Sequence, residues 1–277
     1  MFLKPNLAAG AVAMIMLAGA SSAMASNTLY AINDSSNSLV TINPEAATIT
    51  VIGSLGATGD FGDLTYDSNH GVAYWAAGRG NNNLYTVNLT TGAATLVGSH
   101  GVDDLFGLAY DTGNDTLYGV NTSGDFYSLN TATGAATQIG SNNGVYPGGL
   151  AYVAATDTLF ETLAGGGNFY TINLTNGAAT LFSSNATVLN DNGVTWDASR
   201  GKFFTDDWSR NIYSFDANGQ NATFVMNTSG AYDGIISVGP TGGAVPEPAT
   251  WAMMLVGFGG LGAMLRRRRT QGALAAG

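Results

Sequence analysis

The sequence predicts an all-β fold, a five-bladed β-propeller of four-stranded blades, from the spacing and type of its repeats. Five segments run from a glycine into an apolar strand, with the apolar residue at Leu64, Leu108, Leu150, Val194 and Ile235. Their spacings of 44, 42, 44 and 41 residues are typical of propeller blades. Three further strand-like motifs recur with the same period, so each repeat holds four strands.

These further motifs are short, rich in Thr, Tyr, Val, Ile and Phe, and bounded by Gly, Asn and Asp, as strands are. The second motif of each repeat covers 28–32, 72–75, 116–120, 158–161 and 202–205. The third covers 39–43, 84–88, 126–130, 169–173 and 212–216. The fourth follows a turn of the type Thr-x-Gly, as in residues 133–140.

The order of the motifs at the two ends of the body predicts how the ring closes. The body starts on the second motif at Thr28 and ends on the first motif at 232–238. Four kinds of strand therefore occur five times each only if the two ends share one blade, which removes an open sheet edge. We expect the propeller to span 26–239. The alternative, a β-helix, has shorter rungs and needs no shared first and last unit.

The composition excludes several classes of protein. Charged residues make up 10% of the 277 residues, and the 19 Asp and Glu outnumber the 9 Lys and Arg. An acidic body without a basic cluster argues against nucleic-acid binding. The absence of cysteine excludes disulfides, thiolate metal sites and cysteine nucleophiles.

Residues 1–25 have the three parts of a secretory signal peptide. Lys4 supplies the positive start, residues 7–20 the apolar run, and Ala23-Met24-Ala25 the small-x-small cleavage site. We expect a helix in the precursor, removed by signal peptidase, and a mature chain that begins near Ser26.

The other end predicts a transmembrane helix with a basic stop at 249–269. The apolar residues 249–265 span about 25 Å at 1.5 Å per residue, a short match to the ~30 Å hydrocarbon core of the inner membrane. Four arginines follow, which the positive-inside rule places in the cytoplasm. Residues 240–248 form a linker before the span, and 270–277 form a short tail.

This end resembles the PEP-CTERM sorting signal of Gram-negative bacteria, in the variant with Trp-Ala two residues after Pro-Glu-Pro. The resemblance covers roughly the last 33 residues. It implies that the chain is a substrate of an exosortase, a membrane cysteine transpeptidase, and is exported through the inner membrane to the cell surface or the extracellular space. The residues that match the motif are Pro246, Glu247, Pro248, Trp251, Arg266, Arg267, Arg268 and Arg269. The family usually ends soon after its basic cluster, so the extension 270–277 is a departure.

The body has few residue patterns that are typical of catalysis or metal binding. Asp67, Asp111 and Asp197 end the first strand of their repeats, where we expect them to accept backbone hydrogen bonds in tight turns. His70 and His100 have no nucleophile motif or metal-ligand spacing around them. No cofactor is expected other than Ca²⁺, which hard oxygen ligands could hold.

One set of residues stands out as a candidate ligand or cation face. In a propeller, the loops that lead into the inner strands converge around the axis on one face, together with the turns between second and third strands. Carboxylates beside aromatic rings suit a cation or a carbohydrate. The alternative is that these charges are merely solvated, since loops are where an acidic protein carries them. The set is Asp60, Asp63, Asp103, Asp104, Tyr146, Asp191, Asp233 and Trp208.

Three classes of function follow. The leading one is a non-enzymatic surface protein that contributes to an envelope, a biofilm matrix or contact with extracellular polysaccharide, because near-identical repeats form a symmetric scaffold whereas catalysis needs one asymmetric cluster. The alternative is a carbohydrate-active or lactone hydrolase on the axial face. That class is disfavoured because the body holds only Glu45 and Glu161, and a glycosidase usually needs a Glu as its acid. A protein-binding propeller would use the same face.

Overall fold

The computed structural model describes residues 26–185 and 191–239. They belong to one compact unit, 25–241. The predicted signal peptide at 1–25, the linker at 240–248, the membrane helix at 249–269 and the tail at 270–277 lie outside the described residues. Within the described ranges every regular element is a strand, and there is no helix long and apolar enough to cross a membrane.

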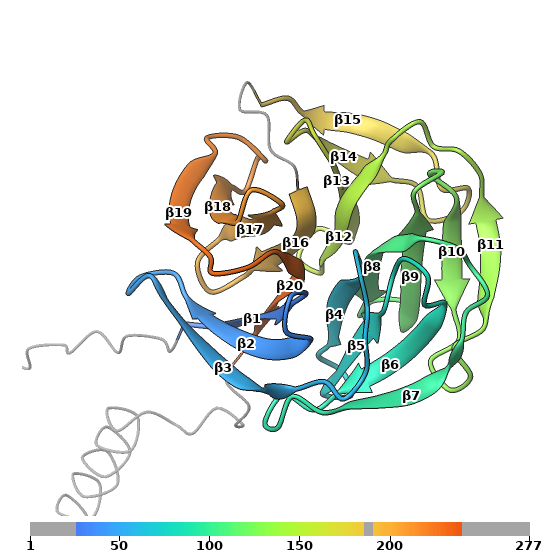
Figure 1. The fold of residues 1–277 in the computed structure, drawn as a ribbon. Coiled ribbons are helices and arrows are strands. Elements are labelled where there is room, and N and C mark those ends of the chain that lie inside the picture. Colours follow the sequence, from blue (N-terminus) through green and yellow to red (C-terminus); the bar gives the residue numbers. More distant parts are fainter. Residues whose placement is uncertain (1–25, 186–190, 240–277) are drawn as a thin grey trace, which may run out of the picture. The chain divides into compact units, whose positions relative to one another are not determined.

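Twenty strands form five four-stranded antiparallel sheets arranged around an axis, which confirms the predicted five-bladed propeller (Figure 1). Blade 1 contains β20 (Tyr232–Val238), β1 (Thr28–Asn33), β2 (Ser38–Asn43) and β3 (Thr48–Ser54). Blade 2 contains β4 (Asp63–Asp67), β5 (Val72–Ala76), β6 (Asn83–Val87) and β7 (Ala94–Ser99). Blade 3 contains β8 (Leu105–Asp111), β9 (Thr116–Asn121), β10 (Phe126–Leu129) and β11 (Ala136–Gly140). Blade 4 contains β12 (Pro147–Val153), β13 (Thr158–Leu163), β14 (Phe169–Ile172) and β15 (Ala179–Ser183). Blade 5 contains β16 (Asp191–Asp197), β17 (Lys202–Asp207), β18 (Asn211–Asp216) and β19 (Thr223–Asn227).

The ring closes in blade 1, as predicted. The last strand, β20, pairs antiparallel with the first strand, β1, and Ile235 lies opposite Ala31 in that ladder. Blade 1 is thus built from both ends of the body, and its inner strand comes from the C-terminal end. The strands at 28–43 and 232–238 share one sheet, so the fold is complete within residues 28–238.

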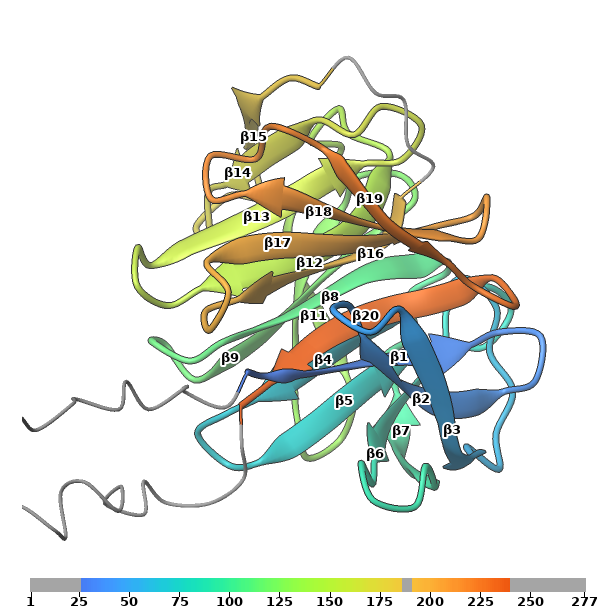
Figure 2. The same ribbon diagram turned by 90° about the vertical axis from the view of Figure 1, so that its left-hand side faces the viewer.

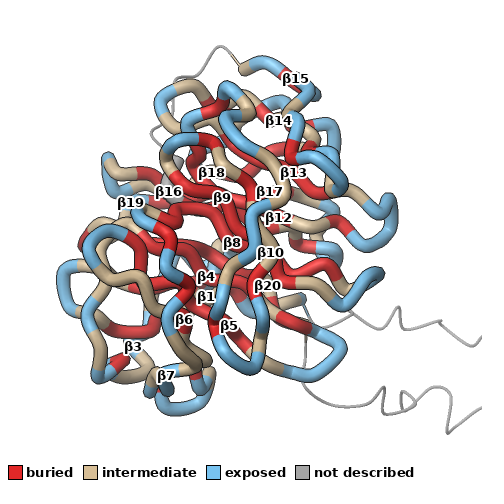
Figure 3. Tube along the Cα trace, turned by 90° about the vertical axis from the view of Figure 1, so that its right-hand side faces the viewer, coloured by how far each residue is buried: buried red, intermediate tan, exposed pale blue. Residues whose placement is uncertain are grey.

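Burial decreases from the axis outward (Figure 3). The inner strand β8 is buried along its whole length, whereas the outer strand β7 has no fully buried residue. This gradient arises because an inner strand is covered by both neighbouring blades, while an outer strand forms the open edge of its sheet. Inner strands accordingly read as continuous apolar runs rather than as alternating patterns.

The core lies between successive blades. Between blades 4 and 5, Phe169 packs with ring centroids 5.0 Å from Phe203 and 5.1 Å from Phe215. All three side chains are fully buried, and burial of each contributes roughly 1.5–3 kcal/mol. Between blades 1 and 2, Trp75 packs in the same way among the buried side chains of Leu39 and Ile236. Each blade is therefore held by its two neighbours, which a closed ring supplies to all five.

The ring has two faces. The start face is the one on which the inner strands begin, and the end face is the one on which they end. The two ends of the body lie side by side at the end face (Figure 2), because Thr28 at the start of β1 pairs with Val238 at the end of β20.

Candidate ligand-binding face

Four blades place a glycine at the axis, directly before the aliphatic residue that faces it. These are Gly107, Gly149, Gly193 and Gly234, and in each case the strand pairing has a bulge beside the glycine. A Cβ on Gly149 would lie 2.8 Å from the Cα of Gly193, and a Cβ on Gly193 would lie 2.7 Å from the Cα of Gly234. At Gly149, Gly193 and Gly234 a neighbouring backbone lies too close for a side chain. At Gly107 the side chains of Val120 and Leu150 occupy that space, which explains the glycine in the repeat.

Blade 2 has Asp63 at the equivalent position, and its carboxylate fills the centre of the start face. Oδ1 accepts a hydrogen bond from the amide of Leu64 at 2.8 Å, and Oδ2 accepts from the amides of Leu108 at 2.7 Å and Leu150 at 3.4 Å. Asp63 is fully buried, and this burial raises its pKa well above the usual value, against the opposing effect of the three amides. The side chain links blades 2, 3 and 4 and is unavailable to an external ligand.

Asp233 also lies inside the ring. It is 1% exposed, and its Oδ2 accepts a hydrogen bond from the amide of Gly62 at 3.4 Å. Two members of the candidate set, Asp63 and Asp233, therefore connect blades to each other rather than facing solvent.

Above them, four aromatic side chains from four blades form a cluster that we call the aromatic cap. Phe61 stacks on Phe106 with ring centroids 5.2 Å apart, and it contacts Trp208 in a tilted arrangement at 3.7 Å. Tyr146 contacts Phe106 edge to face at 6.3 Å. Arg79 lies over the Phe61 ring, with its guanidinium carbon 3.8 Å from the centroid of that ring and 5.6 Å from that of Phe106. Tyr146 is 48% exposed, so the cap presents an aromatic surface to solvent.

The backbone of Phe61 is held in the left-handed region, with φ of 61°. A bulky residue adopts this conformation only under constraint, at a cost of about 1–3 kcal/mol. Such conformations cluster at functional sites. Here the conformation accompanies the contact that Phe61 makes with Trp208 of blade 5.

The remaining acidic residues of the candidate set do not form a metal-ligand group among the described residues. Asp60 lies 3.8 Å from Arg79, and its charge adds to burial in raising the pKa of Asp34. Of Asp191 the structure gives the backbone alone, which pairs with Asp207. Within residues 26–185 and 191–239, no three His, Asp or Glu side chains are grouped as metal ligands. The Ca²⁺ prediction stays a prediction.

Asp103 and Asp104 lie apart from the cap, in a groove of about 550 Å³ beside blade 3. Asp103 accepts a hydrogen bond from the Asn82 amide at 2.7 Å. His100 also lines the groove. Burial lowers the pKa of His100 to about 4, so its imidazole is neutral at physiological pH. Its Nδ1 accepts a hydrogen bond from the amide of Val102 at 3.2 Å.

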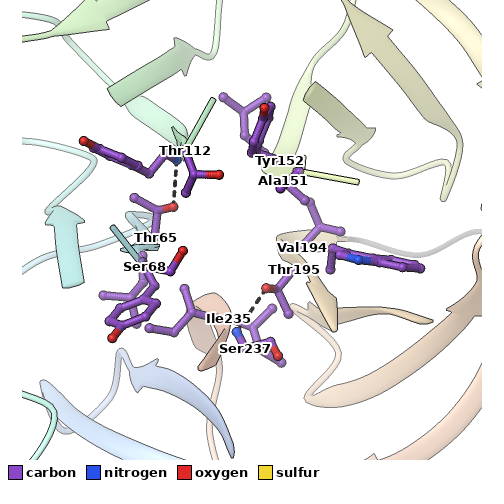
Figure 4. Close-up of a pocket in the computed structure, with 16 residues that line it drawn as sticks. Thr65, Ser68, Thr112, Ala151, Tyr152, Val194, Thr195, Ile235 and Ser237 are labelled. Atoms are coloured by element: carbon purple, nitrogen blue, oxygen red, sulfur yellow. Dashed lines mark hydrogen bonds between the residues drawn. The ribbon is translucent and has the colours of Figure 1, made fainter. Parts of the chain in front are cut away.

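The axis opens on the end face into a cavity of about 150 Å³, lined by inner-strand residues (Figure 4). Its walls carry hydroxyl groups that satisfy neighbouring backbone amides. Thr65 Oγ1 accepts from the amide of Tyr110 at 3.0 Å, and Thr195 Oγ1 accepts from that of Ser237 at 3.1 Å. A polar cavity of this size holds a few water molecules.

Three aspartates in the turns of the end face accept backbone hydrogen bonds, as the sequence predicts. Asp67 Oδ1 accepts the amide of Asn69 at 2.9 Å, Asp111 Oδ1 that of Gly113 at 2.8 Å, and Asp197 Oδ1 that of Ser199 at 2.9 Å. These side chains close the turns between inner and second strands.

The candidate set thus divides in three. Asp63 and Asp233 are internal, Asp60, Tyr146 and Trp208 lie at the aromatic cap, and Asp103 and Asp104 line the groove. The side chain of the eighth residue, Asp191, lies outside the described part of the structure. Sequence reasoning missed Phe61 and Phe106. The signal that could have found them is an aromatic residue a few positions before the axial aliphatic residue, as in Phe61 before Leu64 and Phe106 before Leu108.

Comparison with known families gives two matches. Residues 244–269 match the PEP-CTERM protein-sorting motif, which confirms the resemblance. Residues 5–109 match a domain of unknown function, DUF4394. No curated protein matches the chain.

Two examples represent the solved structures that resemble the fold. One is a chain from the crystal structure of a nidogen/laminin complex, with 14% identity, a TM-score of 0.53, and coverage of 78% of this chain and 82% of that one. The other is a protein of unknown function from Bacteroides thetaiotaomicron VPI-5482, with 17% identity, a TM-score of 0.54, and coverage of 78% and 62%. At these identities the likeness concerns the fold alone.

Proposed function

We propose that the mature protein is a non-enzymatic propeller, displayed at the surface of a Gram-negative cell, that binds extracellular polysaccharide through the aromatic cap. The PEP-CTERM motif at 244–269 implies export, processing by an exosortase and sorting to the cell surface. The propeller is the part of the chain that this route delivers. Its contribution to an envelope or biofilm matrix is then to hold polysaccharide.

The observation that carries the binding proposal is the cap itself. Sugar rings stack on aromatic faces, and their hydroxyl groups bond to carboxylates and amides. The exposed ring of Tyr146 and the partly exposed ring of Trp208 offer such faces. Asp60, which is 45% exposed, and Arg79 lie beside the cap.

The positions of the two glutamates favour binding over glycoside hydrolysis. Glu161 is fully buried in β13, where it reaches no solvent. Glu45 is ion-paired with Arg200 at 2.7 Å near the end face. Neither is placed as the acid that a glycosidase would need at the cap.

The test is binding of a panel of neutral and acidic polysaccharides, measured by affinity electrophoresis. We expect Tyr146→Ala and Trp208→Ala each to weaken binding about tenfold, equivalent to 1.4 kcal/mol, through loss of one stacked ring. Phe224→Ala is the matched control, because it removes a ring that is 51% exposed on an outer strand, and should leave binding unchanged. Equal binding by all variants would contradict the proposal, and release of reducing ends would favour the hydrolase.

A further inference from the structure

The five outer strands, β3, β7, β11, β15 and β19, form the circumference of the ring, which we call the rim (Figure 1). Each has a hydrogen-bonded neighbour on one side only. None of their residues is charged, and none is proline. Proteins usually protect such edges with charges, proline or bulges, because an open edge pairs readily with another strand.

One part of each outer strand is protected by a bulge. The pairing of the third strand with the outer strand shifts register at the same place in all five blades. In blades 1 to 4, the residue after the bulge also contacts a turn of the next blade. A Cβ on Gly53, for example, would lie 2.2 Å from the Thr91 carbonyl oxygen, and the Ser183 hydroxyl donates to the Gly219 carbonyl at 2.8 Å.

The other part, before the bulge, has regular strand geometry and no neighbouring strand on its outer side. In β7 its first amide, that of Ala94, donates to the Leu55 carbonyl of blade 1 at 2.8 Å. This open part of each strand ends in a side chain that occupies the same register position in every blade and points away from the core. In four blades this side chain is apolar and more than half exposed. The five residues are Val51 at 64%, Leu96 at 58%, Leu181 at 53%, Phe224 at 51%, and the exposed polar residue Gln138.

The charges of the molecule lie elsewhere. Of the chain's 19 Asp and Glu and 9 Lys and Arg, all but Glu247 and five of the basic residues fall within 26–239, so this part carries about −14. These charges occupy inner strands, second strands, the end of β18, and the turns and loops. Two copies brought together face to face therefore repel each other, whereas two rims meet as uncharged surfaces.

We propose that the rim is a self-association surface, on which the open part of an outer strand pairs with the same strand of a second copy. A two-fold axis between the copies makes that pairing antiparallel and joins two blades into one continuous sheet. The apolar side chains just before the bulges become covered in the contact. A second copy is the partner that fits because it presents the same uncharged edge.

Two features set the strength of this association. The open parts are short, between two and four residues, so a single contact is weak. The five outer strands of one molecule allow several contacts at once, and linked contacts gain strength through their effective concentration. A population held close together on a surface therefore associates laterally, while dilute protein stays monomeric.

The test is sedimentation velocity of residues 26–239, which contain the complete closed ring, across a concentration series at low and high salt. We expect reversible self-association that strengthens with salt, because salt screens the repulsion between acidic bodies. One lysine in each open strand should weaken it about tenfold or more, since edge lysines block strand pairing. The rim variant carries Val51→Lys, Leu96→Lys, Gln138→Lys, Leu181→Lys and Phe224→Lys.

The matched control carries the same number of lysines on exposed turn residues, Ala46→Lys, Thr90→Lys, Ala132→Lys, Ala198→Lys and Gln220→Lys. It gains the same positive charge, so it should associate at least as well as the unchanged protein. Protein that stays monomeric at every concentration and salt, or a control weakened as much as the rim variant, would overturn the proposal.

Amide hydrogen exchange supplies a second readout that needs no variant. Amides of the open parts of the outer strands should exchange more slowly in concentrated than in dilute protein, while inner-strand amides exchange equally in both. If the rim variant fails to fold, this measurement decides alone. Concentration-independent exchange at 136–138 and 179–181 counts against strand pairing.

Discussion

Asp63 and Glu161 are both fully buried carboxyl groups, and they differ in the hydrogen bonds that compensate for burial. Asp63 accepts hydrogen bonds from three backbone amides, which offset part of the cost of its burial. Glu161 accepts one hydrogen bond, at Oε2 from the Asn143 amide at 2.7 Å, and its Oε1 has no partner. Burial raises the pKa of Glu161 to about 8, so this residue carries its proton at neutral pH.

This pKa predicts a specific dependence of stability on pH. The folded protein binds the Glu161 proton more tightly than the unfolded chain does. The stabilisation of the folded state by this proton is therefore complete below about pH 4.5, and it is lost as the pH rises to about 8. Glu161→Gln keeps the shape and the Asn143 bond but has no proton to lose. We expect the variant to be more stable than the unchanged protein above pH 8, by a few kcal/mol.

The measurement is urea unfolding between pH 5 and 9, compared at equal ionic strength. Gln138→Glu adds a carboxyl group at an exposed position and serves as the control, with little effect on the profile. Parallel curves for Glu161→Gln and the unchanged protein would mean that Glu161 titrates as an ordinary carboxylate.

At the scale of elements, the junction between blade 5 and blade 1 differs from the other four. Where blade 1 meets blade 2, Gly53 on the outer strand packs against the turn at Gly92. At the closing junction the equivalent positions hold Met226 and Ala47, and Ala47 has a φ of 50°. This junction, in which the two ends of the body meet, therefore lacks the close contact between backbones.

Arg200 replaces that contact. From the turn between β16 and β17 it donates to both carboxylate oxygens of Glu45, at 2.7 Å and 3.2 Å, and to the carbonyl of Asn27 at 2.9 Å. Nη1 also bonds to the buried carboxylate of Asp197. The ion pair lowers the pKa of Glu45, chiefly through the hydrogen bond from Arg200.

We expect Arg200→Met to lower the free energy of unfolding by about 3 kcal/mol, because it leaves the buried Asp197 without its counter-charge. The Arg200 side chain is 13% exposed. Lys202→Met is the control: its pair with Asp216 is 41% and 46% exposed, and exposed pairs contribute about 0–1 kcal/mol. Chemical denaturation measures both, and equal losses in the two variants would show that Arg200 has no special part in closure.

At the scale of the whole molecule, the sequence predicted the architecture because each blade repeats one local pattern. Leu64 and its four equivalents recur at a fixed period, and the shared blade follows from the motif order alone, as the pairing of Ala31 with Ile235 confirms. The site was predicted less well. Asp60 and Asp63 are three residues apart, yet Asp63 is buried at the axis and Asp60 lies outside with Arg79. That difference depends on the close approach of the blades around the axis, which no single repeat encodes.

The Ca²⁺ prediction also belongs to this scale, because it rests on the net charge of the whole body. Since Asp63 and Asp233 are internal, Asp60, Asp103, Asp104 and Asp191 are the carboxylates of the predicted set left to bind it. If they bind Ca²⁺, mass action stabilises the fold, and we expect the melting temperature to rise by about 2–4 °C, or about 1 kcal/mol for a domain of this size.

The measurement is thermal unfolding in millimolar CaCl₂ against NaCl of matched ionic strength, which separates binding from screening. Asp60→Asn should reduce the shift. An unchanged melting temperature would leave these carboxylates as solvated charges.

The pairing of Thr28 with Val238 determines the face of the ring at which the C-terminal part of the chain is attached. The described chain leaves the ring at the end face, after β20, and the sorting motif starts six residues beyond Val238. A tether attached there joins the ring at the end face, whereas the aromatic cap lies on the start face. No strand lies beyond Val238 in the described chain, so a cut in the linker would release the ring without opening it. The propeller therefore keeps its fold in both the tethered and the released form.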